Sequence, residues 1–114
     1  MSATDFYLNK GYTPTWKTAV ISAAGTVTIW TPRSSTRIVL TELHCATNLA
    51  TSAAFYFGNL AGLKILQMNL AASGYVDTEI HADSNTMDRT LVGNVAAGST
   101  DGFKVTAVGF EIET

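Results

Sequence analysis

Short runs of β-branched, aromatic and leucine residues recur along this 114-residue chain, and turn-forming residues separate them. The runs lie at spacings near the 8 to 12 residues that are typical of β-sandwiches and β-barrels. Within most runs apolar and polar side chains alternate, which is the period of a strand with one buried face. This pattern predicts an all-β fold of about eight short strands in which no helix is needed. The expected strands cover residues 17–22, 25–31, 36–47, 53–57, 62–71, 74–80, 90–95 and 103–113.

The longest run, TRIVLTELHCAT at residues 36–47, has apolar residues on both of its alternating faces. One predicted face carries Val39, Thr41, Leu43 and Cys45, and the other carries Ile38, Leu40, Glu42 and His44. A strand that is partly apolar on both faces is expected in the centre of a sheet.

Residues 62–71 (GLKILQMNLA) fit two kinds of structure. Leu63, Leu66 and Leu70 match the period of a helix, whereas Leu66, Met68 and Leu70 alternate as in a strand. The flanking glycines leave little room for a helix of ordinary length, so we prefer a strand. Two other strands have clear inner and outer faces: Val76, Thr78 and Ile80 should face in and Tyr75, Asp77 and Glu79 out, while Val108, Phe110 and Ile112 should be buried.

Charged residues make up only 14% of the chain and apolar residues 46%, with a net charge of −2. Soluble domains average about 25% charged residues, so this surface is unusually neutral and suits coverage by another protein. The lysines and arginines are scattered along the chain. Nucleic-acid binding is therefore disfavoured, because phosphate contacts need a concentrated basic face.

The chain has one cysteine, Cys45, which excludes an intramolecular disulfide and is expected to be a buried thiol. A single cysteine without a disulfide partner in the chain suits folding in a reducing cytosol. The first ten residues lack the basic and then apolar pattern of a signal peptide. No apolar run approaches the roughly 20 residues that span a bilayer, so no membrane association is expected.

Residues 1–16 (MSATDFYLNKGYTPTW) have no sustained period and are predicted to form an extended N-terminal arm in front of a β-sandwich domain of residues 17–114. The arm carries Phe6, Tyr7, Leu8, Tyr12 and Trp16. Such a density of aromatic residues can cover the chain's own sandwich or anchor it to a neighbouring subunit, and area burial serves both uses.

Candidate catalytic groups are few. His44 and Cys45 are adjacent, so on a strand their side chains lie on opposite faces and cannot form a Cys-His dyad. Asp77 and Glu79 share a face but would be about 6.5 to 7 Å apart at the backbone, with no cleft indicated around them. There is no phosphate-binding loop, nucleophile elbow, HExxH or CxxC motif. We expect no enzymatic activity, no catalytic residue and no cofactor.

The segment from His81 to Asp88 (HADSNTMD) contains several oxygen ligands that could in principle hold calcium. It lacks the central glycine and the terminal glutamate of an EF-hand loop. A solvated loop held by Asx turns is the preferred interpretation, and no metal site is predicted.

Three aromatic residues, Trp30, Tyr56 and Tyr75, fall on the outward side of their predicted strands. Exposed aromatics of a sandwich can stack on sugars, but packing against another subunit is the commoner use. The predicted interface residues are Phe6, Tyr7, Tyr12, Trp16, Trp30, Tyr56 and Tyr75.

Residues 35–114 resemble the small β-sandwich proteins that coat tailed-phage heads or form head fibres. The resemblance rests on the opening strand TRIVLTEL (residues 36–43), the aromatic strand AFYFG (54–58) and the closing strand GFKVTAVGFEI (102–112). It implies an antiparallel, jelly-roll-like β-sandwich and a homo-oligomer, often a trimer. It also implies a protein that is made in the host cytoplasm and binds the major capsid protein on the virion surface.

The leading hypothesis is thus a capsid decoration, or cement, protein that stabilises the phage head, since a binder of the assembled form stabilises it by mass action. The alternative is a carbohydrate- or receptor-binding module of a viral fibre, which would use the exposed aromatics and the loop from Asp83 to Asp88. A hydrolase on the same sandwich is a third and weaker hypothesis.

Overall fold

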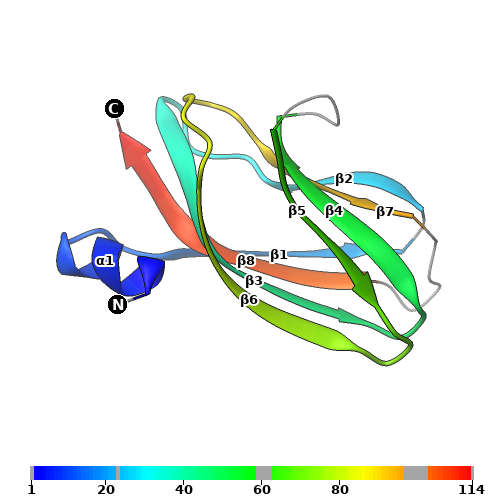
Figure 1. Cartoon of the computed structure of the whole chain (residues 1–114). Helices are drawn as coiled ribbons and strands as arrows, with labels where there is room; N and C mark the ends of the chain where they lie inside the picture. Colours follow the sequence, from blue (N-terminus) through cyan, green and yellow to red (C-terminus); the bar gives the residue numbers. More distant parts are fainter. Residues whose placement is uncertain (1, 23, 59–62, 97–102, 114) are drawn as a thin grey trace.

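The computed structural model describes residues 2–22, 24–58, 63–96 and 103–113. They form a two-layer β-sandwich with one short helix outside it (Figure 1). The helix α1 is Ala3–Asn9. The strands are β1 (Thr15–Ile21), β2 (Gly25–Trp30), β3 (Thr36–Thr47), β4 (Thr51–Phe57), β5 (Leu63–Leu70), β6 (Tyr75–Asp83), β7 (Leu91–Val95) and β8 (Phe103–Glu113).

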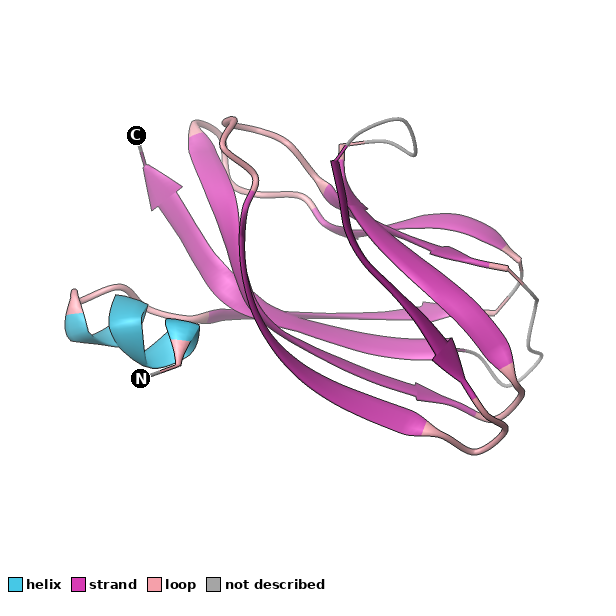
Figure 2. Cartoon of the chain, viewed as in Figure 1, coloured by secondary structure: helices cyan, strands magenta, loops and turns pink. Residues whose placement is uncertain are grey.

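The strands form two four-stranded sheets in which all neighbouring pairs are antiparallel. Sheet A has the order β1-β8-β3-β6, and sheet B has the order β2-β7-β4-β5 (Figure 1). Figure 2 shows the strands of the two layers, with the helix outside them. This strand order is that of a jelly roll, so the predicted all-β, jelly-roll-like sandwich is confirmed. Every predicted strand is present, with ends that differ from the prediction by at most three residues, and residues 63–70 form a strand, not a helix.

The main core lies between the two sheets. Its largest fully buried side chains include Trp30, Phe55, Phe57, Phe103 and Leu43. Burial of aromatic and aliphatic area on this scale is the chief source of stability in a domain of this size. No helix among the described residues is long and apolar enough to cross a membrane.

A bulge in β3 changes the predicted faces of the longest strand. Leu40 pairs with Gly109 of β8, but Glu42 pairs with Val108, so Thr41 is an extra residue on β3. As a result Leu40 and Leu43 both face the main core, and the prediction that Val39 shares a face with Leu43 is wrong. The predicted burial of Val108, Phe110 and Ile112 is confirmed.

The bend at this bulge creates a second, smaller cluster on the outside of sheet A. Tyr7, Val39, Phe110 and Ile112 form this cluster, apart from the core between the sheets. A bulge bends its strand, and Figure 1 shows β3 and β8 curving where α1 lies against sheet A. A side chain at Gly109 would place its Cβ 2.2 Å from the carbonyl oxygen of Val39, so the close approach of β8 to β3 requires glycine.

The first sixteen residues are not an extended arm, because Ala3–Asn9 forms a helix and β1 begins at Thr15. The Ser2 hydroxyl caps the helix by accepting a hydrogen bond from the backbone N–H of Asp5 at 3.1 Å. Asp5 also lies in the first turn, where the helix dipole favours a negative charge. A seven-residue helix is too short to stand alone, so the buried contacts of Tyr7 stabilise it.

Trp30 does not face outward as predicted. The register of β2 against β7 shifts between Thr28 and Trp30, and this irregularity turns both Ile29 and Trp30 into the core. The indole N–H of Trp30 donates to the Glu111 carboxylate at 2.9 Å. Burial tends to raise the pKa of Glu111, but hydrogen bonds from Trp30 and Arg33 outweigh it and lower that pKa below its ordinary value.

Candidate functional site

The outward residues of sheet A form one continuous surface, which we call the A face. Strand pairing arranges it in three rows across β1, β8, β3 and β6. The rows are Trp16-Val108-Glu42-Glu79, Thr18-Thr106-His44-Asp77 and Val20-Lys104-Ala46-Tyr75. The predicted outward direction of Tyr75, Asp77 and Glu79 is confirmed.

Large apolar side chains are concentrated at the A face and at the helix beside it. The described residues include eight large hydrophobic side chains that are exposed. Six of them lie on the A face or on residues 6–12, namely Phe6, Leu8, Tyr12, Trp16, Val20 and Tyr75. Trp16 is 70% exposed and Tyr75 is 75% exposed. Exposed apolar area of this density marks interaction surfaces in soluble proteins.

A groove of about 430 Å³ lies beside Trp16, between α1 and the A face. Leu8, Pro14, Trp16 and Val108 give it apolar walls, and Thr4, Glu42, His44 and Thr106 supply polar groups. The groove is therefore an apolar depression with polar groups at defined positions, which is the usual composition of a binding site.

A chain of hydrogen bonds crosses the A face from the helix to β6. The Thr4 hydroxyl donates to Glu42 Oε2 at 2.6 Å. Glu42 Oε1 lies 3.1 Å from Nε2 of His44, and Nδ1 of His44 lies 2.8 Å from Asp77 Oδ1. Carboxylates only accept hydrogen bonds, so this arrangement is complete when both ring nitrogens of His44 carry a proton.

The electrostatics of this chain favour the charged imidazole. The hydrogen bond to Asp77 raises the pKa of His44, and the bond to Glu42 adds to this, while partial burial opposes both. The result is a pKa above the ordinary value for histidine. These hydrogen bonds orient Glu42 and His44 and so preorganise the polar side of the Trp16 groove.

Tyr7 attaches the helix to the sheet. Its ring lies 5.2 Å from that of Phe110, and its hydroxyl lies 2.8 Å from Nε2 of His81. Burial raises the pKa of the Tyr7 hydroxyl, and the Asp83 carboxylate raises it further. Tyr7 therefore covers the chain's own sheet, while Phe6 and Tyr12 keep about two fifths of their surface exposed, at 42% and 39%.

The structure separates the predicted interface residues into three groups. Trp16 and Tyr75 lie on the A face, with Phe6 and Tyr12 beside it. Tyr7 and Trp30 are buried, so neither is available to a partner. Tyr56 is half-buried on the outside of sheet B, with the Lys64 ammonium 6.0 Å from its ring centre. The alternation of apolar and polar residues predicts which side chains point outward. It does not show that Glu42, His44 and Asp77 are in contact, because that contact depends on the register of β3 against β6.

Several of the groups considered for catalysis or metal binding have structural partners or are buried. His44 and Cys45 lie on opposite faces as predicted, and burial raises the pKa of Cys45 to about 12. Asp83 binds Arg37 at 3.1 Å, and Asp88 accepts a hydrogen bond from the backbone of Ser35 at 2.8 Å. Across residues 2–22, 24–58, 63–96 and 103–113, no group of three or more His, Cys, Asp or Glu could hold a metal ion.

Comparison with known proteins identifies the fold. No protein-family model matches the chain, and no curated protein sequence matches it either. The chain is similar to the subunit of Bacillus endospore appendages, described as disulfide-linked pili, at 12% identity and a TM-score of 0.51. That match covers 90% of this chain and 91% of the other. At this identity it shows a shared β-sandwich fold and nothing further.

Two other solved structures match with lower TM-scores. A family 6 carbohydrate-binding module is 12% identical with a TM-score of 0.45, over 92% of this chain and 90% of the other. The coat protein of Tobacco streak virus is 11% identical with a TM-score of 0.43, over 89% of this chain and 88% of the other.

Proposed function

We propose that this chain is a non-catalytic structural protein that binds another protein surface through its A face. The observation that carries this proposal is the concentration of exposed apolar side chains on one face of a low-charge sandwich. In its specific form the proposal is a capsid decoration protein, an oligomer and often a trimer, that binds the major capsid protein on the outside of a phage head. The sequence resemblance to head-coating proteins supports this form.

The dimensions of the molecule are adequate for such a role. Its extents are 39 × 28 × 18 Å, so a broad face spans roughly 1,000 Å². A standard protein interface buries about 800 Å² on each partner. Aromatic residues contribute much of the binding energy of protein interfaces, and Trp16 and Tyr75, on the edge strands β1 and β6, have the exposure that such anchors need.

The proposed association is non-covalent. The appendage subunit of similar fold is named for disulfide-linked pili, but Cys45 of this chain is buried in the main core. Its raised pKa keeps it as an unreactive thiol. Closed symmetry would let one surface serve every copy in an oligomer.

Cosedimentation with tailed-phage shells, together with mass measurement of the free protein in solution, tests the proposal. We expect Trp16→Ala to weaken shell binding by at least about tenfold, as for an interface anchor. Met87→Ala is the matched control, because Met87 is 45% exposed but lies outside the A face. A protein that stays monomeric and sediments with no shell, or a Trp16 variant that binds as the unchanged protein does, would contradict it.

A further inference from the structure

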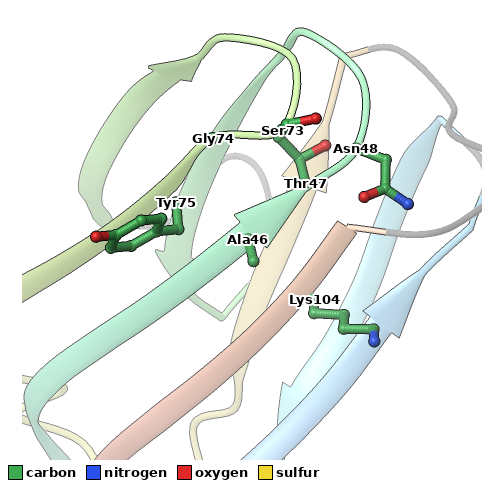
Figure 3. Close-up of a pocket in the computed structure, with 7 residues that line it drawn as sticks. All are labelled: Ala46, Thr47, Asn48, Ser73, Gly74, Tyr75 and Lys104. Atoms are coloured by element: carbon green, nitrogen blue, oxygen red, sulfur yellow. The ribbon is translucent and has the colours of Figure 1, made fainter.

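In the row of the A face that strand pairing places farthest from Trp16, Ala46, Tyr75 and Lys104 line a hollow of about 260 Å³ (Figure 3). We infer that it binds an acidic sugar, that is, a hydroxylated ring carrying a carboxylate. Its floor is Ala46, which pairs with Lys104 of β8 on one side and with Tyr75 of β6 on the other. Strands lie about 4.8 Å apart, so Lys104 and Tyr75 are separated by about 10 Å at the backbone, and the short Ala46 leaves that space open.

The wall of the hollow comes from two loops that hydrogen bonds join. The backbone N–H of Thr47 donates to the carbonyl oxygen of Gly74 at 3.0 Å, and that of Ser73 donates to the carbonyl oxygen of Asn48 at 3.1 Å. Ser73 has a φ of 58°, in the left-handed region, and these bonds hold it there. The hollow is therefore formed before a ligand arrives, which lowers the entropy that binding must remove.

The side chains around the hollow suit a ring with both apolar and charged parts. Tyr75 is 75% exposed and lies at the edge of the hollow with its ring directed away from Lys104 (Figure 3), so the C–H groups of a sugar would contact it at that edge. Asn48 and Ser73 carry neutral groups that donate and accept hydrogen bonds. Among the described residues that line the hollow, only Lys104 is charged, and an ammonium binds a carboxylate with a charge-assisted hydrogen bond.

This combination distinguishes the ligand from simpler ones. A small anion would use Lys104 but leave Tyr75 without a contact, and a neutral sugar would do the reverse. The acidic residues of the A face lie in the other two rows, where Asp77 is bonded to His44. The volume is below the roughly 300 to 1,000 Å³ of sites for drug-sized molecules, so it fits one sugar ring.

The inference does not rest on the proposed function. Both use Tyr75, but the hollow and the Trp16 groove share no lining residue, so Lys104, Ala46 and Trp16 distinguish the two. Either can fail while the other holds. Variants at Lys104 and Ala46 report on the sugar, and variants at Trp16 report on the protein partner.

The test is an NMR titration of the ¹⁵N-labelled full chain with glucuronic acid, glucose and acetate in parallel. We expect glucuronic acid to shift the amides of Ala46, Ser73 and Tyr75 with a Kd of about 1 mM, an affinity reasonable for a single ring. Glucose and acetate should each bind at least about tenfold more weakly, because each lacks one of the two contacts.

Variants that keep the fold locate the site. Lys104→Gln should weaken glucuronic acid by about tenfold and leave glucose unchanged, while Tyr75→Ala should weaken both. Ala46→Leu should fill the hollow and abolish binding, and Trp16→Ala should leave it intact. Acetate binding as tightly as glucuronic acid, an unaffected Lys104→Gln variant, or no shift up to about 50 mM ligand would overturn the inference.

Discussion

The outer faces of the two sheets follow the same alternation of inward and outward residues, yet they present different chemistry. The outward positions of sheet B hold mainly small or polar side chains, among them Thr26, Thr28, Ser52, Ala54, Gln67, Asn69 and Asn94. Several bond to one another, as Asn94 does to Thr26 at 2.9 Å and Lys64 to Gln67 at 2.6 Å. The corresponding positions on the A face include Trp16, Val20 and Tyr75.

This difference shows that the inward residues of a strand, which form the core, and its outward residues, which form the surface, vary independently. Both sheets need one apolar face to form the core, and the period of two supplies it. What the outward positions carry is free to vary, and only the A face exposes large apolar groups on its described strands. The A face also has a helix against it, which sheet B lacks within the described residues.

The two tryptophans give the sharpest test of this comparison. Trp30→Ala should lower the free energy of unfolding by about 3 to 5 kcal/mol, since it empties a core site and removes a hydrogen bond to Glu111. Trp16→Ala should change it by no more than about 0.5 kcal/mol, because that ring is 70% exposed. Urea denaturation measures both values. Equal losses in the two variants would show that the assignment of one tryptophan to the core and one to the surface is wrong.

A pair of glycines compares the backbone of the two sheets. Gly109→Ala in sheet A should cost about 3 kcal/mol, because the new Cβ would meet the carbonyl oxygen of Val39 at 2.2 Å and backbone cannot yield. Gly93→Ala in sheet B should cost about 1 kcal/mol, because the atoms nearest to its Cβ belong to the side chains of Ile29 and Phe55, at 3.0 and 3.3 Å. Thermal or urea unfolding ranks them. A Gly93 variant less stable than the Gly109 variant would contradict the proposed bend.

The strands could be predicted from the sequence because alternation and turn residues are local signals. Residues 36–47 and 103–113 have the predicted bounds. The errors arise where an irregularity of register changes the face of a residue, since a one-residue shift moves side chains to the other side of a sheet. The predicted faces of Trp30 and Val39 are wrong for this reason. Alternation alone cannot show a bulge, because its cause is the pairing with another strand.

The sequence predicts the candidate site only in part. Tyr75 is predicted to face outward, and this is confirmed. Trp16 is predicted as an interface residue of the N-terminal arm, and it lies 70% exposed on β1. The sequence gives no clear sign of the helix. Its seven residues carry one buried side chain, Tyr7, and a single buried residue cannot show the helical repeat of apolar positions. The Ser2 cap followed by Asp5 was the signal that could have indicated it. The Glu42, His44 and Asp77 contacts join two strands far apart in sequence, and no local pattern reports them.

The helix that covers only sheet A should detach without unfolding the sandwich. Tyr7→Ala removes the buried side chain that packs on Phe110 and the bond to His81, at an expected cost of about 2 kcal/mol. Hydrogen exchange should show lost protection in residues 3–9, with the strands unaffected, because the cluster under the helix is separate from the main core. Leu8→Ala is the control, as Leu8 is 43% exposed. Loss of protection throughout both sheets would contradict this.

The smallest expected effect is a pH dependence that belongs to the A face. The folded pKa of His44 is raised, so its bonds stabilise the protein fully below the unfolded value of about 6.5 and are lost as pH rises through the folded pKa. Because His44 is partly exposed, we expect the free energy of unfolding to fall by less than about 1 kcal/mol between pH 6 and pH 8.

Above the folded pKa of His44 one ring nitrogen loses its proton and faces a carboxylate without donating to it, which should also loosen the Thr4 contact to Glu42. Asp77→Asn should remove more of this pH dependence than Glu42→Gln, since the bond to Asp77 is the larger cause. Urea midpoints at the two pH values measure it, and a pH dependence that persists in His44→Gln would assign the effect elsewhere.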